Sequence, residues 1–439
     1  FYESAAKRPE RKNLAVCRKG QYEGLGKLST DEGAPDFGPA EFNDAARRTG
    51  ATAVGARDFL IAYNINLNTT SSRRANAIAF DIREAGRIKK RDGITGPAIL
   101  DAQGEPVRIP GTLKSVKGIG WYIEEYGIAQ LSLNLTDINV TPVHVAFDEA
   151  CTKAQARGIR VTGSELVGLL PLRVLLDAAD HYLRKQQRSL GISEAEKVKI
   201  AVKSLGLDDL APFDPAKRVI EYIIAEKGNS PLIHMTLTQF ADTTASEAPA
   251  PGGGSISAYA GALGAALATM VANLSAHKRG WDDRWEEFSV HAEKGLALQN
   301  QLMALVDADT QAFDAIMAAY GMPKGSDDQK AKRHQAIQDA TRNAIDIPMQ
   351  VAQLAHDGLG LASAMAGDGN PNSVTDAGVG AMCLRTAVLG AVLNARINCG
   401  DLEDADYVDQ IQSRCAKLVE SATRQESEIL ATVDRVMAG

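Results

Sequence analysis

An acidic side chain lies where a helix of this chain should be apolar. In the segment around residue 309, apolar residues recur at alternate steps of four and three, as on one face of a helix; they are Leu298, Leu302, Leu305, Ala312 and Ile316. Asp309 occupies the same stripe. A buried carboxylate is costly unless it is paired, hydrogen-bonded or protonated, and burial raises its pKa towards the range that general acid–base catalysis needs.

Asp309 therefore has two interpretations, a catalytic acid or base and a polar residue at a helix crossing or subunit interface. Asp307 lies two residues earlier and should point to the opposite side of the helix. We expect Asp307 to be solvated.

A glycine-rich turn precedes a helix of small residues. Gly252, Gly253 and Gly254 let the backbone approach a ligand closely, and a helix start offers free N–H groups to it. The alternative is a tight linker with Ser255 as the helix N-cap. The triplet alone does not decide between them.

Amide and carboxylate groups gather near the end of the chain. Asn394 and Asn398 are four residues apart, hence on one helix face, where they could orient a polar heterocycle or bond across a helix interface. Asn370 lies in a loop that ends at a helix start bearing Asp376.

The first half of the chain offers weaker signals. A Gly-Pro turn at Gly38 and Pro39 opens a loop that ends at Gly50, and turn chemistry alone can explain it. His144 stands at a helix start, where packing or capping competes with catalysis. The other histidines lack metal-ligand spacing, and no nucleotide-binding motif is present, so we expect neither a metal nor a nucleotide.

Two kinds of secondary-structure pattern divide the chain near residue 230. Before it, strand-like and helix-like runs follow the order βαββαβ, with strands over 55–68, 115–124, 129–136 and 159–169. After it, long helical segments recur at 255–277, 284–320, 327–356, 374–398 and 405–437. The predicted fold is an α+β domain with a split βαββαβ sheet, followed by an all-α domain. The predicted divisions are 1–54, 55–225, a linker at 226–232, and 233–439.

Composition excludes several classes of protein. The chain has 439 residues and a net charge of −7, which argues against nucleic-acid binding through a whole-protein positive field. Five cysteines without a CxxC pair indicate reduced thiols in a cytoplasmic compartment. The uncharged segment 255–276 is long enough to span a bilayer, but its Ala, Gly and Ser content favours a tightly packed helix of a soluble bundle.

Several long motifs resemble the bifunctional formimidoyltransferase-cyclodeaminase family. The transferase half is similar in GATAVGARDFLIAYNINLNT, VKGIGWYIEEYGIAQLSLNLTD and GSELVGLLPL, and the cyclodeaminase half in SEAPAPGGGSISAYAGALGAALATMVANL, LVDADTQAF and GNPNSVTDAGVGA. The resemblance implies a ferredoxin-like transferase subdomain and a helical cyclodeaminase domain. It also implies a cytoplasmic enzyme of histidine degradation with the substrates N-formimidoyl-L-glutamate and polyglutamylated tetrahydrofolate, and a homo-oligomer built as a ring of dimers. We expect neither nucleic acid nor membrane as a partner.

The resemblance also assigns roles to residues. It makes Asp309 the cyclodeaminase acid and base, and it assigns folate binding to the segment with Gly38, Pro39, Ala40, Glu41, Phe42 and Gly50. The segment is a few residues longer here than in the family. The candidate cyclodeaminase pocket comprises Gly252, Gly253, Gly254, Ser255, Asn370, Asp376, Asn394 and Asn398.

One family feature is not found in these residues. The family's transferase histidine lies in a His-Pro-Arg motif of a first subdomain, which we expect upstream of Phe1. Residues 1–54 would then be the end of that subdomain. Two alternatives remain, a cyclodeaminase with a degenerate folate-capturing domain and a non-catalytic folate-binding assembly module.

Overall fold

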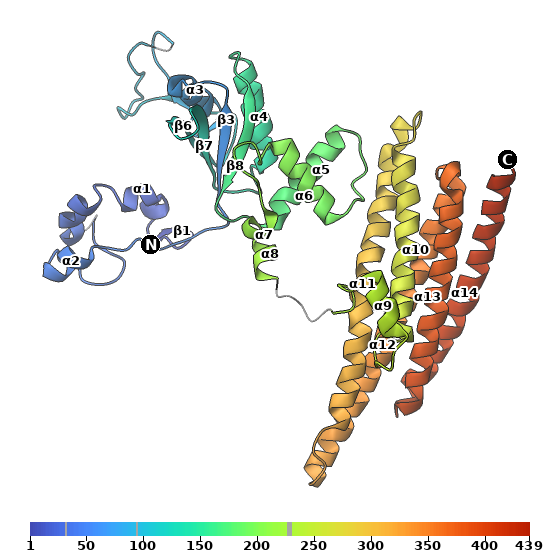
Figure 1. Cartoon of the computed structure of the whole chain (residues 1–439). Coiled ribbons are helices and arrows are strands. Elements are labelled where there is room, and N and C mark those ends of the chain that lie inside the picture. The colour runs from blue at the N-terminus through green and yellow to red at the C-terminus, as the bar shows by residue number, and fades with distance from the viewer. Residues whose placement is uncertain (31–32, 94, 226–230) are drawn as a thin grey trace. The chain divides into compact units, whose positions relative to one another are not determined.

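The computed structural model describes residues 1–30, 33–93, 95–225 and 231–439 (Figure 1). The chain forms two compact units, one comprising residues 1–178 and 202–222, the other 179–201 and 223–439. An α+β unit is thus followed by a helical unit, as the sequence predicts. Most of the predicted linker, residues 226–230, lies outside the described residues.

The α+β unit is built around a four-stranded antiparallel sheet. Its strands are β3 (Ile61–Leu67), β6 (Val116–Ile123), β7 (Ile128–Leu135) and β8 (Val161–Val167), in the order β6-β7-β3-β8. The helices α3 (Ser72–Ile82) and α4 (Val143–Gln155) follow β3 and β7, which gives the predicted succession βαββαβ. The predicted strand at 55–68 is divided into β2 (Gly55–Ala56) and β3.

One face of this sheet forms the core with α3 and α4. Alternate residues of β3 and β7 are completely or almost completely buried; they are Ile61, Tyr63, Ile65, Leu67, Ala129, Leu131, Leu133 and Leu135. Gly120 of β6 permits close contact with α3, because a Cβ atom there would lie 2.1 Å from the backbone nitrogen of Asn76. The other strands and α-helices before residue 226 are β1 (Tyr2–Glu3), α1 (Leu14–Cys17), α2 (Asp44–Thr49), β4 (Arg87–Ile88), β5 (Arg108–Ile109), α5 (Leu172–Lys185), α6 (Glu194–Leu205), α7 (Pro215–Arg218) and α8 (Ile220–Ile224). Of these, α5, α6 and α8 each contain residues of both units.

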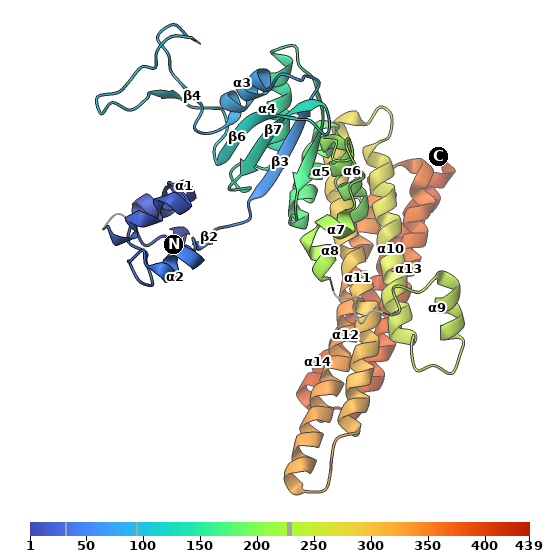
Figure 2. The same ribbon diagram turned by 60° about the vertical axis from the view of Figure 1, so that its left-hand side comes forward.

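Five long helices run side by side in the helical unit (Figures 1 and 2). They are α10 (Gly253–Ala276), α11 (Trp285–Tyr320), α12 (Asp327–Asp368), α13 (Val374–Asn398) and α14 (Ala405–Ala438), and a short helix, α9 (Leu237–Thr244), precedes them. α12 continues twelve residues beyond the predicted end at 356, with Pro348 inside it.

Small residues set the spacing between α10 and α13. A Cβ atom on Gly264 would lie 2.7 Å from the carbonyl oxygen of Gly380, and one on Gly261 would lie 3.2 Å from Ala387 Cβ. Any larger side chain would push the two helices apart. The interior consists mainly of alanine and aliphatic residues of α10 to α14.

Candidate active site

Asp309 of α11 lies against the first turn of α10. The Ser255 hydroxyl donates to Asp309 Oδ2 at 3.2 Å, and it also lies 3.4 Å from the hydroxyl of Thr310. The structure buries Leu302, Leu305 and Ala312 on the same side of α11, as the predicted stripe requires. Asp309 itself is partly exposed, so its carboxylate lies at the edge of the core.

The glycine turn is what brings the backbone of α10 onto this carboxylate. A Cβ atom on Gly254 would lie 2.0 Å from Asp309 Oδ1 and 2.4 Å from Cγ, so no larger residue fits there with Asp309 in place. α10 begins at Gly253 with Gly252 as its N-cap, and Ser255 is therefore inside the helix. The expectation that Ser255 is the N-cap is wrong, because Gly252 occupies that position and the Ser255 hydroxyl bonds Asp309 instead.

Asn394 of α13 forms the third side of the same site. Its amide nitrogen lies 3.2 Å from where a Cβ atom of Gly253 would be, and it donates to Gly390 O at 2.8 Å. Ser257 donates to Gly253 O at 2.6 Å, which fixes the first turn of α10. Three helices therefore bring together Gly253, Gly254, Ser255, Asp309 and Asn394.

The electrostatics of Asp309 suit proton transfer. Burial raises the pKa of Asp309 above the ordinary aspartate value, because desolvation disfavours the charged form. Hydrogen bonds from the side chain and backbone of Ser255 act in the opposite direction and lower the pKa. The net effect is a raised pKa, which brings the group closer to the pH at which a general acid–base catalyst works best.

The structure places the other predicted pocket residues elsewhere. Asn398 donates to Ala344 O of α12 at 2.8 Å, which is the interhelical bond of the alternative interpretation. The backbone N–H of Asn370 donates to Ser275 Oγ at the far end of α10, and Asp376 follows on the first turn of α13. Because α10 has 24 residues, these two lie roughly 30 Å from Asp309 in the same chain.

Asp307 is buried, with 4% of its surface exposed, so the expectation that it is solvated is wrong. Its Oδ1 accepts from the N–H of Leu232 at 2.9 Å, and its Oδ2 accepts from the N–H of Ile233 at 3.3 Å. The available signal was the apolar Val306, which lies off the predicted stripe and indicates that α11 is buried on more than one side.

The predicted folate-binding segment is a surface structure in the α+β unit. Gly38, Pro39, Ala40 and Glu41 are exposed, and α2 occupies the residues that precede Gly50. Phe42 is partly buried, with Tyr22 and Arg47 against its ring at centroid distances of 6.3 and 5.6 Å. Gly38 and Gly50 have φ angles of 87° and 70°, which favour glycine.

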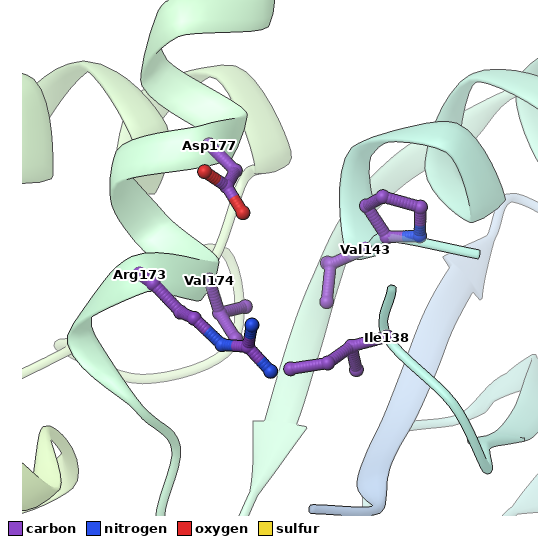
Figure 3. A pocket seen from close by; sticks show the side chains of 6 residues that line it. Ile138, Val143, Arg173, Val174 and Asp177 are labelled. Atoms are coloured by element: carbon purple, nitrogen blue, oxygen red, sulfur yellow. The ribbon is translucent and has the colours of Figure 1, made fainter. Parts of the chain in front are cut away.

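His144 lies in the first turn of α4 and is 9% exposed. Near it the same unit has a recess of about 10 Å³, room for roughly one water molecule. Figure 3 shows this recess between Ile138, Val143, Arg173, Val174 and Asp177. Neither Asp309 nor the folate-binding segment lines it.

The described residues also bear on metal binding and membrane insertion. Among the described residues, no group of three or more His, Cys, Asp or Glu side chains could hold a metal ion. The helix α10 and the segment Pro371–Asp401 are long and apolar enough to cross a membrane, and 61% and 50% of their most apolar windows are buried inside the unit. Such helices are equally typical of the core of a soluble bundle.

Three family models together match most of the chain. They are described as formiminotransferase-cyclodeaminase (residues 236–417), formiminotransferase domain (62–225) and formiminotransferase domain, N-terminal subdomain (1–57). A formimidoyltransferase-cyclodeaminase from Rattus norvegicus is 38% identical over 436 residues, which cover 99% of this chain and 76% of the relative. The chain belongs to the formimidoyltransferase-cyclodeaminase family.

Two shorter relatives of this family member each match less than half of it. A methenyltetrahydrofolate cyclohydrolase from Methylorubrum extorquens is 35% identical over 198 residues, 45% of this chain and 95% of the relative. A glutamate formimidoyltransferase from Streptococcus pyogenes serotype M1 is 37% identical over 185 residues, 42% of this chain and 53% of the relative. These two relatives therefore have different named activities.

Proposed function

We propose that this chain is a bifunctional folate enzyme. Its α+β unit serves transfer of the formimidoyl group from N-formimidoyl-L-glutamate to N5 of tetrahydrofolate. Its helical unit converts 5-formimidoyltetrahydrofolate to 5,10-methenyltetrahydrofolate and ammonia, a lyase reaction of histidine degradation. The observation that carries the second activity is the partly buried Asp309 carboxylate, which is held by Ser255 against the Gly254 backbone.

The cyclisation needs one proton acceptor that later becomes a donor. N10 of the folate attacks the amidinium carbon, a new C–N10 bond forms, and N10 gives its proton to the Asp309 carboxylate. Asp309 then returns that proton to the departing nitrogen as the C–N bond breaks, so ammonia leaves and the methenyl cation remains. A carboxyl group of raised pKa is suited to both steps.

Family membership and the observed strand order support a ferredoxin-like transferase subdomain. The strands β3, β6, β7 and β8 are the four of a split βαββαβ unit, with the first and third in the middle of the sheet. We assign folate contact in this unit to the Gly38–Gly50 segment. A cytoplasmic location, with neither membrane nor nucleic acid as a partner, completes the proposal.

Exposed apolar side chains on the helical unit support a homo-oligomer. Along α10, Ile256, Leu263, Met270 and Leu274 are exposed at helical spacing, and on α13 Val379, Met382, Leu393 and Ile397 are exposed. Adjacent apolar faces of this kind are typical of protein–protein interfaces, and closed symmetric assembly would cover them in every copy. The proposed homo-oligomer is a ring of dimers, as the family resemblance implies. A monomeric mass by light scattering at micromolar concentration would contradict it.

The cyclohydrolase relative favours a second candidate reaction for the helical unit, hydrolysis of the methenyl group. Water would replace N10 as the nucleophile, and the same carboxylate would accept its proton. The two reactions differ in their absorbance signal, because cyclisation produces methenyltetrahydrofolate and hydrolysis consumes it. Each substrate is therefore to be supplied separately.

The test of the proposed function is the Asp309→Asn variant with 5-formimidoyltetrahydrofolate. The nearly isosteric amide should preserve the fold but remove proton transfer, so the rate should fall about 10²–10⁴-fold. Asp314→Asn, on an exposed part of the same helix, is the matched control and should leave the rate unchanged. Cyclisation by Asp309→Asn at the parent rate would refute the assignment.

The transferase activity has its own assay, release of glutamate from N-formimidoyl-L-glutamate in the presence of tetrahydrofolate. We expect very slow release from residues 1–439 alone, because no His-Pro-Arg motif is present in them. Substantial release would instead place the catalytic centre within this chain, and His144→Ala would be the first variant to examine.

A further inference from the structure

Within the helical unit, the segment that precedes α10 is attached to α11 at Asp307, two residues before the candidate catalytic carboxylate of Asp309. We call residues 231–252, which contain α9, the strap. The strap begins at Leu232 and Ile233, whose N–H groups bond Asp307. It ends at Gly252, the N-cap of α10, one residue before the turn that contacts Asp309.

A third contact fixes the middle of the strap. The ring of Phe240 in α9 lies 5.5 Å, centroid to centroid, from the ring of Tyr259 in α10. Tyr259 is four residues after Ser255, so the two share a face of α10 and lie about one helical turn apart. The strap therefore contacts α10 about one helical turn beyond the residue that bonds Asp309.

Apart from these contacts, α9 is weakly held. None of its residues is buried, and 74% of the surface of Leu237 is exposed. By contrast, Leu232 is 4% exposed and belongs to the core of the unit. The strap thus combines a firm attachment at its start with a loosely packed helix beside the candidate active site.

The hydrogen bonds of Asp307 suit a residue that holds the strap rather than one that transfers a proton. Each of its oxygens accepts a backbone N–H, so the carboxylate is hydrogen-bonded on both sides. Charge-assisted bonds of this kind are about twice as strong as neutral ones. By contrast, Asp309, two residues away, is bonded by Ser255 alone among the contacts that the structure describes, and it is partly exposed.

We propose that Asp307 is a positioning residue of the cyclodeaminase site, which holds the strap in place as one wall of the folate-binding pocket beside Asp309. This inference rests on the proposed function. The carboxylate of Asp307 does not touch the substrate; it fixes the backbone at 232–233 and thereby the position of Phe240 over the first turns of α10.

The test is the Asp307→Asn variant. Its amide NH₂ group would face the backbone N–H of either Leu232 or Ile233, and two donors cannot bond each other, so one of the two bonds is lost. Hydrogen exchange should accelerate in peptides covering 231–240 and stay unchanged in the α12 core at 345–366. KM for 5-formimidoyltetrahydrofolate should rise about tenfold, the loss expected for a charge-assisted bond, with kcat changed less than about threefold. The acid limb of the pH profile should match the parent, and Asp314→Asn should match it in every readout.

Each other result overturns the inference. Unchanged exchange at 231–240 would mean that Asp307 does not hold the strap, and faster exchange with an unchanged KM would mean that the strap is no wall. A fall in kcat with an altered acid limb would make Asp307 a proton-transfer residue. Should Asp307→Asn not fold, Ile233→Pro removes one donor from the exposed side, and failure of both variants would show that the bonds support the core rather than the pocket.

The exchange measurement keeps this inference separate from the proposed function. If Asp309→Asn cyclises at the parent rate, the catalytic assignment fails whatever the strap does. If Asp309→Asn is inactive while Asp307→Asn behaves like the parent, the proposed function stands and the role of Asp307 fails.

Discussion

The two units position their candidate site residues in opposite ways. In the helical unit, Gly254, Ser255, Asp309 and Asn394 come from three helices whose inner faces form a continuous core. In the α+β unit, the folate-binding segment Gly38–Gly50 belongs to a stretch in which no described residue from 1 to 60 is buried. The two sites thus differ in burial: the residues around Asp309 belong to a core, and those around the folate-binding segment do not. A core fixes side chains to the small tolerances that proton transfer needs, whereas an exposed segment has few contacts to fix it.

Among the variants that compare the two units, the largest effect should come from Gly254→Val, which tests whether close packing creates the helical site. Its Cβ atom would occupy the position of the Asp309 carboxylate, 2.0 Å from Oδ1. Displacement of a catalytic group by about 1 Å can cost 10²-fold in rate, so cyclisation should fall at least about that much. Steady-state kinetics measures the loss.

The adjacent Gly253→Val is the graded comparison. Its Cβ atom would lie 3.2 Å from the Asn394 amide, a contact that a small shift can relieve. We expect weaker folate binding, a smaller loss of rate and a nearly unchanged melting temperature. Equal losses for the two variants would contradict a site built around Asp309.

Gly120→Ala tests whether the two units are independent. The new methyl group would meet the backbone of α3 at 2.1 Å, and overpacking of this kind costs about 1–3 kcal/mol. The α+β unit should become easier to unfold, as measured by limited proteolysis, while the cyclisation rate stays at the parent value. Gly26→Ala, with open space around its Cβ position, is the neutral control. Loss of cyclisation in Gly120→Ala would show that the helical unit depends on the sheet.

The raised pKa of Asp309 predicts a trade between stability and activity. Its folded-state pKa lies above that of the unfolded chain, so stability falls as the pH rises through the interval between them. Asp309→Asn should therefore melt at a higher temperature than the parent at neutral pH. The difference should vanish below about pH 3.9, where the unfolded chain is protonated too. A lower melting temperature at neutral pH would mean that the ionised carboxylate stabilises the fold.

The smallest effect should come from Ser255→Ala. The Ser255 hydroxyl lowers the pKa of Asp309 by bonding its charged form. Without that bond the pKa rises further, so the acid limb of the cyclisation pH profile should move to higher pH. Ser257→Ala loses a bond to Gly253 O instead and should leave the limb in place.

The sequence alone determined the order of the two units and the type of secondary structure in each. Alternating and helical patterns predict the βαββαβ succession and the long helices, because burial of one face repeats at the spacing of the element. The position of Asp309 on an apolar stripe followed from the same rule. So did the close packing of the Gly and Ala helix, since small side chains leave no other way to fill the space between helices.

Only the tertiary structure decided which of the candidate residues meet. Asn394 lies beside Gly253 at one end of the bundle, and Asn370 and Asp376 lie at the other end. The sequence alone predicts a single pocket for all of them. Val306 could indicate burial on the Asp307 side of α11, but the backbone partners of Asp307 were fixed only by the position of the strap against that helix. Helical spacing fixes the direction in which a side chain points, but contact between helices depends on their crossing and on the path of the connecting chain, which local pattern does not contain.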